Sequence, residues 1–246
     1  MYLTRFRINT ARLGARHLLS SPQRMHAAVM SSFAGAIPSE ENASRILWRL
    51  DRNSNAEVLL FIVSEERPDL THLVEQAGWP TTASWQTYDY KNFLDGLTTG
   101  STWNFRLTAN PVHHVRRTPD EIRKRTAHRT PRHQMGWLLS RQEQAGFRIL
   151  ETPADRRVLA QGDEHQLTVR DEQRAGAGRR APRRPANKNP PRAPGQANRG
   201  PLVTVTFDGR LEVTDPAALR RTLTLGLGKA KAYGCGLMTL AREGGR

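Results

Sequence analysis

Hydrophobic and polar positions along the chain recur with the period of a strand in some segments and of a helix in others. They predict strands interrupted by helices. In the first half, apolar residues that alternate or run together predict four strands: Tyr2–Ile8, Ile46–Leu50, Val58–Val63 and Gln86–Tyr90. A helix begins at Ser21-Pro22, where a capping residue precedes a proline, and another covers Asp69–Gln76. This half therefore has the order strand, helix, strand, strand, helix, strand.

The second half repeats this order approximately, with additional strands. Its predicted strands are Trp103–Ala109, Phe147–Leu150, Gln166–Val169, Val203–Phe207, Leu211–Val213 and Leu237–Thr239. Helices begin at Thr130-Pro131, ending at Gly146, and at Asp215-Pro216. Asp208-Gly209 has the sequence of a hairpin turn and is predicted to join two of the strands.

A repeated βαββαβ order is typical of the ferredoxin-like, RRM-like plan. We therefore predict an α+β protein with two tandem ferredoxin-like domains, residues 1–95 and 96–246. Sheets of this kind with one open face often bind single-stranded RNA, but the fold alone does not establish a function.

Charge points to the kind of partner. The formal net charge is +15, from 38 Lys and Arg against 23 Asp and Glu, so a polyanion is expected. The first acidic residue is Glu40, with five arginines before it. Residues 171–200 carry +6 and many prolines and glycines, which predicts a disordered or extended basic loop or, equally, a solvated linker. The remaining residues still carry +9.

Composition also excludes several classes of protein. A single cysteine excludes a disulfide framework and cysteine-rich metal sites. The longest apolar run, Val58–Val63, is too short to span a bilayer, and the N-terminus has no apolar core of the signal-peptide type. We therefore expect a cytoplasmic protein without a membrane partner.

Residues 226–236, here called the glycine loop, give the strongest local signal. Its glycines allow a close backbone approach to a phosphate and its lysines supply charge. The candidate RNA contacts are Gly226, Gly228, Lys229, Gly234 and Gly236, and the loop also carries Lys231 and Tyr233. A tight helix-to-strand connection explains the same glycines.

His26 lies at the edge of the apolar stripe Met25, Val29 and Phe33 in the first predicted helix. A histidine at the rim of a core is the ordinary interpretation. The alternative is acid or base catalysis, because a histidine titrates near neutrality and Arg24 adds positive charge beside it.

Further basic residues are candidate RNA contacts. A central run supplies Arg116, Arg117, Arg123, Lys124, Arg125, His128 and Arg129, the basic loop supplies Arg179, Arg180, Arg183 and Arg184, and Arg5 lies in the first strand. His113, His114, His128 and His133 are crowded by cations that repel a divalent ion, so no metal and no cofactor is expected.

Several segments together resemble one family, the CasE-type CRISPR-associated endoribonucleases, over nearly the whole chain outside residues 171–200. They are MYLTRFRI with QRMHAAVMSSF, WNFRLTANP, RTAHRTPRHQMGWLLSRQEQAGFRIL, and DGRLEVTDPAAL followed by GLGKAKAYGCGLMTLA. The resemblance implies two ferredoxin-like domains that bind a CRISPR repeat RNA stem-loop, cut it at the base of the stem, and remain a subunit of the Cascade complex.

The resemblance also implies a site. His26 matches the family's catalytic histidine, whereas Gln23 stands where the family commonly has a tyrosine. The implied reaction is a metal-independent transphosphorylation leaving a 2′,3′-cyclic phosphate, with Arg24, Lys229 or Lys231 stabilising charge and Tyr233 replacing the missing tyrosine. The alternatives are a catalytically impaired RNA-binding module of the same fold and a ribosomal or DNA-binding structural protein.

Overall fold

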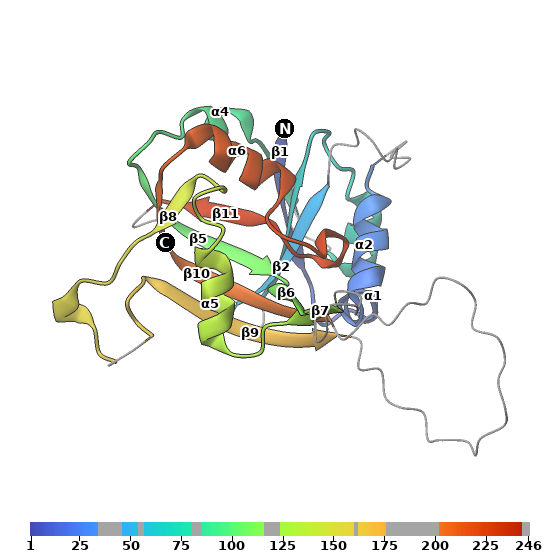
Figure 1. Cartoon of the computed structure of the whole chain (residues 1–246). Helices are drawn as coiled ribbons and strands as arrows, with labels where there is room; N and C mark the ends of the chain where they lie inside the picture. The colour runs from blue at the N-terminus through green and yellow to red at the C-terminus, as the bar shows by residue number, and fades with distance from the viewer. Residues whose placement is uncertain are drawn as a thin grey trace, which may run out of the picture.

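The structure is a computed structural model that describes residues 1–33, 46–53, 57–79, 85–115, 124–159, 162–175 and 202–242. Two antiparallel sheets with helices packed against them form the body of the molecule (Figure 1). Both sheets have the strand order of the ferredoxin-like plan, so the predicted α+β fold is confirmed.

The first sheet has the order β2-β3-β1-β4. Its strands are β1 (Tyr2–Ile8), β2 (Leu47–Arg52), β3 (Val58–Ser64) and β4 (Trp85–Asp89). Three helices pack on one face: α1 (Leu13–Leu19), α2 (Pro22–Met30) and α3 (Thr71–Ala77). α4 (Lys91–Asp95) follows β4.

The second sheet has the order β11-β5-β10-β8. Its strands are β5 (Thr102–Ala109), β8 (Phe147–Ile149), β10 (Leu202–Val213) and β11 (Met238–Ala241). α5 (Pro131–Leu139) and α6 (Pro216–Leu225) contribute to its core face, and Figure 1 shows α5 in front of the strands and α6 above β11.

Further elements extend this second unit. β6 (Val112–Val115) pairs with β7 (Lys124–Ala127) in a separate hairpin between β5 and α5. β9 (Leu167–Ala175) pairs with the first part of β10. Short 3₁₀ helices occur at η1 (Ala154–Arg156) and at η2 (Lys231–Tyr233), which lies in the glycine loop.

The two faces of β2 belong to two different cores. Trp48 packs with α1, α2 and α3 in one core, whereas Leu47 joins the core of the second sheet. The expected domain boundary at residues 95 and 96 falls at the end of α4, and Leu94 and Leu97 on either side of it are buried in that same second core. The two sheets therefore share packing through β2 and the α4 region.

The predicted hairpin turn at Asp208-Gly209 is wrong. β10 runs without interruption from Leu202 to Val213, and Asp208 and Gly209 pair with β5 on one side and β9 on the other. Gly209 is needed because a Cβ there would clash with the carbonyl oxygen of Gln166. The glycine permits close strand packing rather than a turn.

Other differences concern the ends of elements. α5 ends at Leu139 instead of Gly146, and turns connect it to β8. β9 extends to Ala175, so the first residues of the predicted loop 171–200 are strand, and residues 176–200 lie outside the described residues. The elements α1, α4, β6 and β7 were not predicted. None of the described helices is long and apolar enough to span a membrane.

Candidate active site

α2 carries His26, and its sequence explains where the helix begins. Ser21 is extended, and Pro22 at the first helical position has a fixed φ that suits a helix start. The Ser21 hydroxyl does not cap the backbone and instead donates to Oε1 of Gln23 at 2.6 Å. Met25 is buried below the helix, which leaves the neighbouring His26 half-buried at the rim of the core.

The His26 ring has a defined partner. Nε1 of Trp48 donates to Nδ1 of His26 at 3.4 Å. Partial burial lowers the pKa of His26 because it penalises the charged imidazolium. Burial therefore favours the neutral imidazole, and its Nδ1 faces the protein interior.

The glycine loop joins α6 to β11 and passes beside α2, since η2 contacts that helix. Gly226, Gly228, Gly234 and Gly236 all have positive φ values between 77° and 94°. A Cβ at Gly234 would lie 2.7 Å from Cζ3 of Trp48. The loop backbone thus packs directly on the indole that contacts His26.

A cavity of about 310 Å³ lies between α2, the glycine loop and the second sheet. Its lining includes Ser21 and Pro22 from the start of α2, together with Tyr233 and Gly234. His26, Arg24 and Lys231 are not among the described residues that line it. The structure therefore brings Tyr233 to the start of the predicted catalytic helix.

The predicted cations beside the helix have local partners. Arg24 is exposed and donates to Oγ of Ser20 at 2.7 Å and to Nδ1 of His17 at 3.4 Å. Nζ of Lys231 donates to the carbonyl oxygen of Leu225 at 2.6 Å, and Lys229 is exposed. Both lysines are carried by the loop that passes α2, as the candidate site requires.

Arg5 lies on β1, whereas His113, His128 and His133 lie at the β6–β7 hairpin and the start of α5. Arg5 is exposed on β1 and donates to Oε1 of Gln86 at 2.7 Å. The rings of His113 and His128 are 4.4 Å apart between centroids, and those of His128 and His133 are 5.9 Å apart. Nδ1 of His133 also lies 2.6 Å from Oγ1 of Thr130.

These three imidazoles, here called the histidine stack, connect the β6–β7 hairpin to the start of α5. Burial, then the neighbouring His113 and His133, then Arg141 lower the pKa of His128. Within the described ranges, no group of three or more His, Cys, Asp or Glu side chains could hold a metal ion.

The remaining predicted RNA contacts are described only in part. Arg129 is exposed next to the histidine stack. Lys124 and Arg125 belong to β7, but their side chains are not described. Outside the described residues lie Arg116, Arg117, Arg123, Arg179, Arg180, Arg183 and Arg184.

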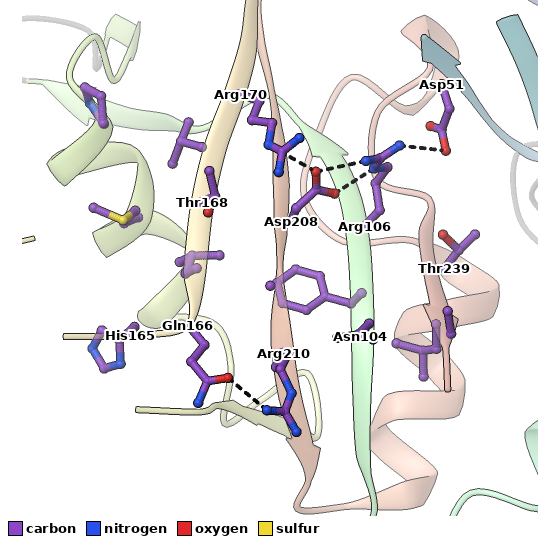
Figure 2. A pocket seen from close by; sticks show the side chains of 18 of the residues that line it. Asp51, Asn104, Arg106, His165, Gln166, Thr168, Arg170, Asp208, Arg210 and Thr239 are labelled. Carbon is purple, nitrogen blue, oxygen red and sulfur yellow. Dashed lines mark hydrogen bonds and ion pairs between the residues drawn. The ribbon is translucent and has the colours of Figure 1, made fainter. Parts of the chain in front are cut away.

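Sequence reasoning missed a chain of ion pairs between the two sheets. Arg49 and Asp51 form a two-bonded pair at 2.6 and 2.9 Å, and Asp51 lies 3.6 Å from Arg106. Arg106 in turn pairs with Asp208 at 2.6 and 2.9 Å, and Arg170 approaches the same carboxylate at 3.5 Å (Figure 2). This chain, here called the arginine–aspartate network, crosses from β2 to β9.

Arg49 also binds the backbone of the second sheet. It donates to the carbonyl oxygens of Arg106 and Leu237 and to Oγ1 of Thr239, at 2.7, 3.0 and 2.8 Å. The network borders an open groove of about 910 Å³, where Figure 2 also shows Arg210 bonded to Gln166. Because the aspartates neutralise most of its arginines, we assign the network to holding the sheets together.

The signal for this network was present but ambiguous. Trp48 and Leu50 alternate with Arg49 and Asp51, a pattern that predicts a strand but is typical of one with a single buried face. Only the position of the second sheet shows that both sides of β2 are buried. The contact of Trp48 with His26 was missed for the same reason.

Comparison with known proteins agrees with this architecture. The sequence model of a family described as CRISPR associated protein matches residues 1–242. The CRISPR-associated endoribonuclease Cse3 of Thermus thermophilus is 31% identical over 242 residues, covering 98% of this chain and 100% of the relative.

Solved structures of CRISPR-associated proteins are also similar to this chain. Thermus thermophilus Cse3 bound to an RNA representing a pre-cleavage complex has a TM-score of 0.71 and 28% identity, covering 98% of each chain. The CRISPR-associated protein Cas6e from Escherichia coli K-12 has a TM-score of 0.58 and 20% identity, covering 98% of this chain and 99% of its own. The second likeness is evidence for the fold alone.

Proposed function

The chain belongs to the CRISPR-associated protein family, and we propose that it cleaves precursor CRISPR RNA at the base of the repeat stem-loop. The relative with 31% identity is an endoribonuclease, and a related structure holds a pre-cleavage RNA. The CasE-type resemblance seen in the sequence is confirmed. It supports the further proposal that the chain stays bound to its product as a Cascade subunit.

The proposed reaction is an internal transphosphorylation. The 2′-oxygen bonds to phosphorus while the bond from phosphorus to the 5′-oxygen breaks, leaving a 2′,3′-cyclic phosphate and a 5′-hydroxyl. One proton leaves the 2′-hydroxyl and another reaches the 5′-oxygen. Holding these atoms in line supplies much of the acceleration, and no metal ion takes part.

His26 is the proposed group for proton transfer, since it is a neutral imidazole beside the glycine loop. Arg24, Lys229 and Lys231 supply positive charge for the pentavalent phosphorus intermediate. Tyr233 lines the cavity at the start of α2 and can replace the tyrosine that the family commonly has at the position of Gln23, because an amide cannot transfer a proton usefully.

One observation carries this proposal: α2 and the glycine loop, which are about 200 residues apart in sequence, lie side by side. RNA binding by the loop would therefore place a phosphate near His26. The exposed arginines Arg5 and Arg129, with the basic segments outside the described residues, are proposed to bind the phosphates of the stem.

The proposal is tested by incubating a repeat hairpin RNA with the protein in EDTA and measuring the masses of the product ends. Cyclic phosphate and 5′-hydroxyl ends are expected, and His26→Ala should abolish single-turnover cleavage. His165→Ala is the control, because that histidine precedes β9 and lies outside the candidate site. Undiminished cleavage by His26→Ala would show that the assignment is wrong.

One observation favours a second candidate, a catalytically impaired RNA-binding module. Gln23 is exposed and bonded to Ser21, where the family commonly has a tyrosine. Intact RNA that stays bound after long incubation, with no cyclic phosphate ends, would support this alternative. If the wild type cleaves slowly and Gln23→Tyr cleaves faster, the chain is instead a slow enzyme.

A further inference from the structure

The hydrogen bond between Trp48 and His26 determines where the imidazole carries its proton. The indole nitrogen can only donate, so Nδ1 of His26 must offer its lone pair across the 3.4 Å between them. A neutral imidazole has one N–H, and here it must be at Nε2. The nitrogen that remains for a substrate therefore presents a hydrogen.

The indole is held firmly in this orientation. Trp48 is 2% exposed and packs in the core beneath α1, α2 and α3. On its other side, Gly234 lies so close that any Cβ would be 2.7 to 3.1 Å from three carbons of the six-membered ring. The first core and the glycine loop therefore clamp the indole between them.

Charged and titratable groups on the neighbouring elements leave this assignment intact. α1 supplies His17, α2 supplies Arg24, η2 supplies Lys231 and Tyr233, and His72 on α3 bonds to the carbonyl oxygen of Ala28 at 3.0 Å. Among the described residues, none of the ion pairs involves His26. Burial lowers the pKa of His26, and the hydrogen bond from Trp48 to the lone pair of Nδ1 favours the same neutral form.

We propose that Trp48 is a positioning residue that fixes His26 as the Nε2–H tautomer and so makes it the proton donor to the leaving 5′-oxygen. The inference rests on the proposed function of His26. A neutral imidazole can donate to a developing oxyanion. The Nε2 proton passes to the 5′-oxygen and leaves an imidazolate, the 2′-hydroxyl proton passes to water by way of Tyr233, and that water then returns a proton to Nε2.

The proposal gives the glycine loop a second role. Gly234 belongs to the second ferredoxin-like unit, yet its backbone supports the indole that orients a histidine in the first. RNA bound by the loop and the orientation of His26 are therefore linked through Trp48. Misplacing a reacting group by about 1 Å can cost about a hundredfold in rate.

The test replaces Trp48 by Phe, which keeps an aromatic ring and removes the N–H. The ¹⁵N shifts of His26 distinguish its tautomers, and a titration of the same signals gives its pKa. In the wild type we expect the Nε2–H form. In Trp48→Phe we expect mixed tautomers, a higher pKa, an inflection of the pH–rate profile at higher pH, and cleavage slower by about tenfold to a hundredfold with RNA affinity unchanged.

Gly234→Ala should produce the same changes in the His26 signals without altering the indole chemically. Gly100→Ala is its matched control, since Gly100 also has a positive φ, of 81°, but a Cβ there meets nothing within 4 Å. An unchanged tautomer and pKa in Trp48→Phe would overturn the proposal. If the His26 signals change in Trp48→Phe but His26→Ala keeps full activity, the proposed function is overturned and the tautomer assignment stands.

Discussion

Arg49 is a single buried residue whose loss should be costly. Its side chain is 1% exposed and donates to Asp51, to two backbone carbonyls and to Thr239. Arg49→Met would leave a buried carboxylate with one distant partner at 3.6 Å and two carbonyls without this donor. We expect the free energy of unfolding to fall by about 3–5 kcal/mol, measured by urea denaturation.

Arg7→Met is the matched control for this substitution. Arg7 also pairs with a carboxylate, Glu57 at 3.1 Å, but its side chain is 55% exposed. Its loss should change the free energy of unfolding by less than about 1 kcal/mol. Equal denaturation midpoints for the two variants would refute the assignment of Arg49 to joining the sheets.

Cys235 offers another test at the level of one residue. Burial raises the pKa of its thiol to about 12, and the thiolate is the form that reacts. At pH 8 a thiol-reactive disulfide reagent should modify the native protein about a hundredfold or more slowly than the urea-unfolded protein. Because the chain has one cysteine, the absorbance change reports on this site alone. Fast labelling of the native state would contradict its burial.

At the level of elements, a strand was predicted correctly where local alternation decided it and wrongly where residues distant in sequence did. The strand β1 was predicted correctly because Arg5 and Arg7 alternate with buried Phe6 and Ile8. Asp208-Gly209 was misread because the dipeptide resembles a turn, while Arg106 and Gln166, which are distant in sequence, make it strand. Local chemistry was sufficient for β1, whereas at Asp208-Gly209 distant residues overrode it.

The histidine stack gives the β6–β7 hairpin and α5 a dependence on pH. The pKa of His128 lies below its ordinary value of 6.5, so the folded state resists protonation. As pH falls through 6.5 toward the lowered pKa, the unfolded chain binds more protons and stability is lost. We expect amide exchange in β6 and β7 to accelerate between pH 7 and 5.5, at matched intrinsic rates.

His128→Asn should reduce this acceleration, since it removes the titrating ring from the stack. The carboxylates Asp69, Asp163 and Glu164, whose pKa values are lowered, titrate below this window and affect both proteins alike. Identical pH dependence in the variant and the wild type would remove the histidine stack as the cause.

Over the whole molecule, the candidate site is built from both sheets. His26 and the glycine loop could be found from the sequence, because a helix start and a glycine-rich run are local patterns. Trp48 could not, since its significance depends on Gly234 packing against it from the other unit. The same holds for Arg106 and Arg170, whose partners lie far away in sequence. The proposed reacting group could therefore be found from local sequence, whereas the residue proposed to orient it could be found only from tertiary packing.

The basic segment 176–200 tests how the whole molecule binds RNA. It carries six arginines and one lysine and no acidic residue, and β9 and β10 flank it on either side. If these cations bind phosphates, deleting the segment should weaken binding of a repeat hairpin and lower the slope of log affinity against log salt. Each phosphate that the protein no longer neutralises reduces that slope by about 0.7–0.9.

A second variant separates charge from chain length, with the seven cations replaced by glutamine in a segment of unchanged length. Both variants should show the same decrease in the salt slope, as measured by fluorescence anisotropy at several salt concentrations. Since His26 and Trp48 are untouched, cleavage at saturating protein should keep its rate. An unchanged slope in both variants would show that the segment is only a linker. The salt dependence would then come from the rest of the chain, which still carries positive charge.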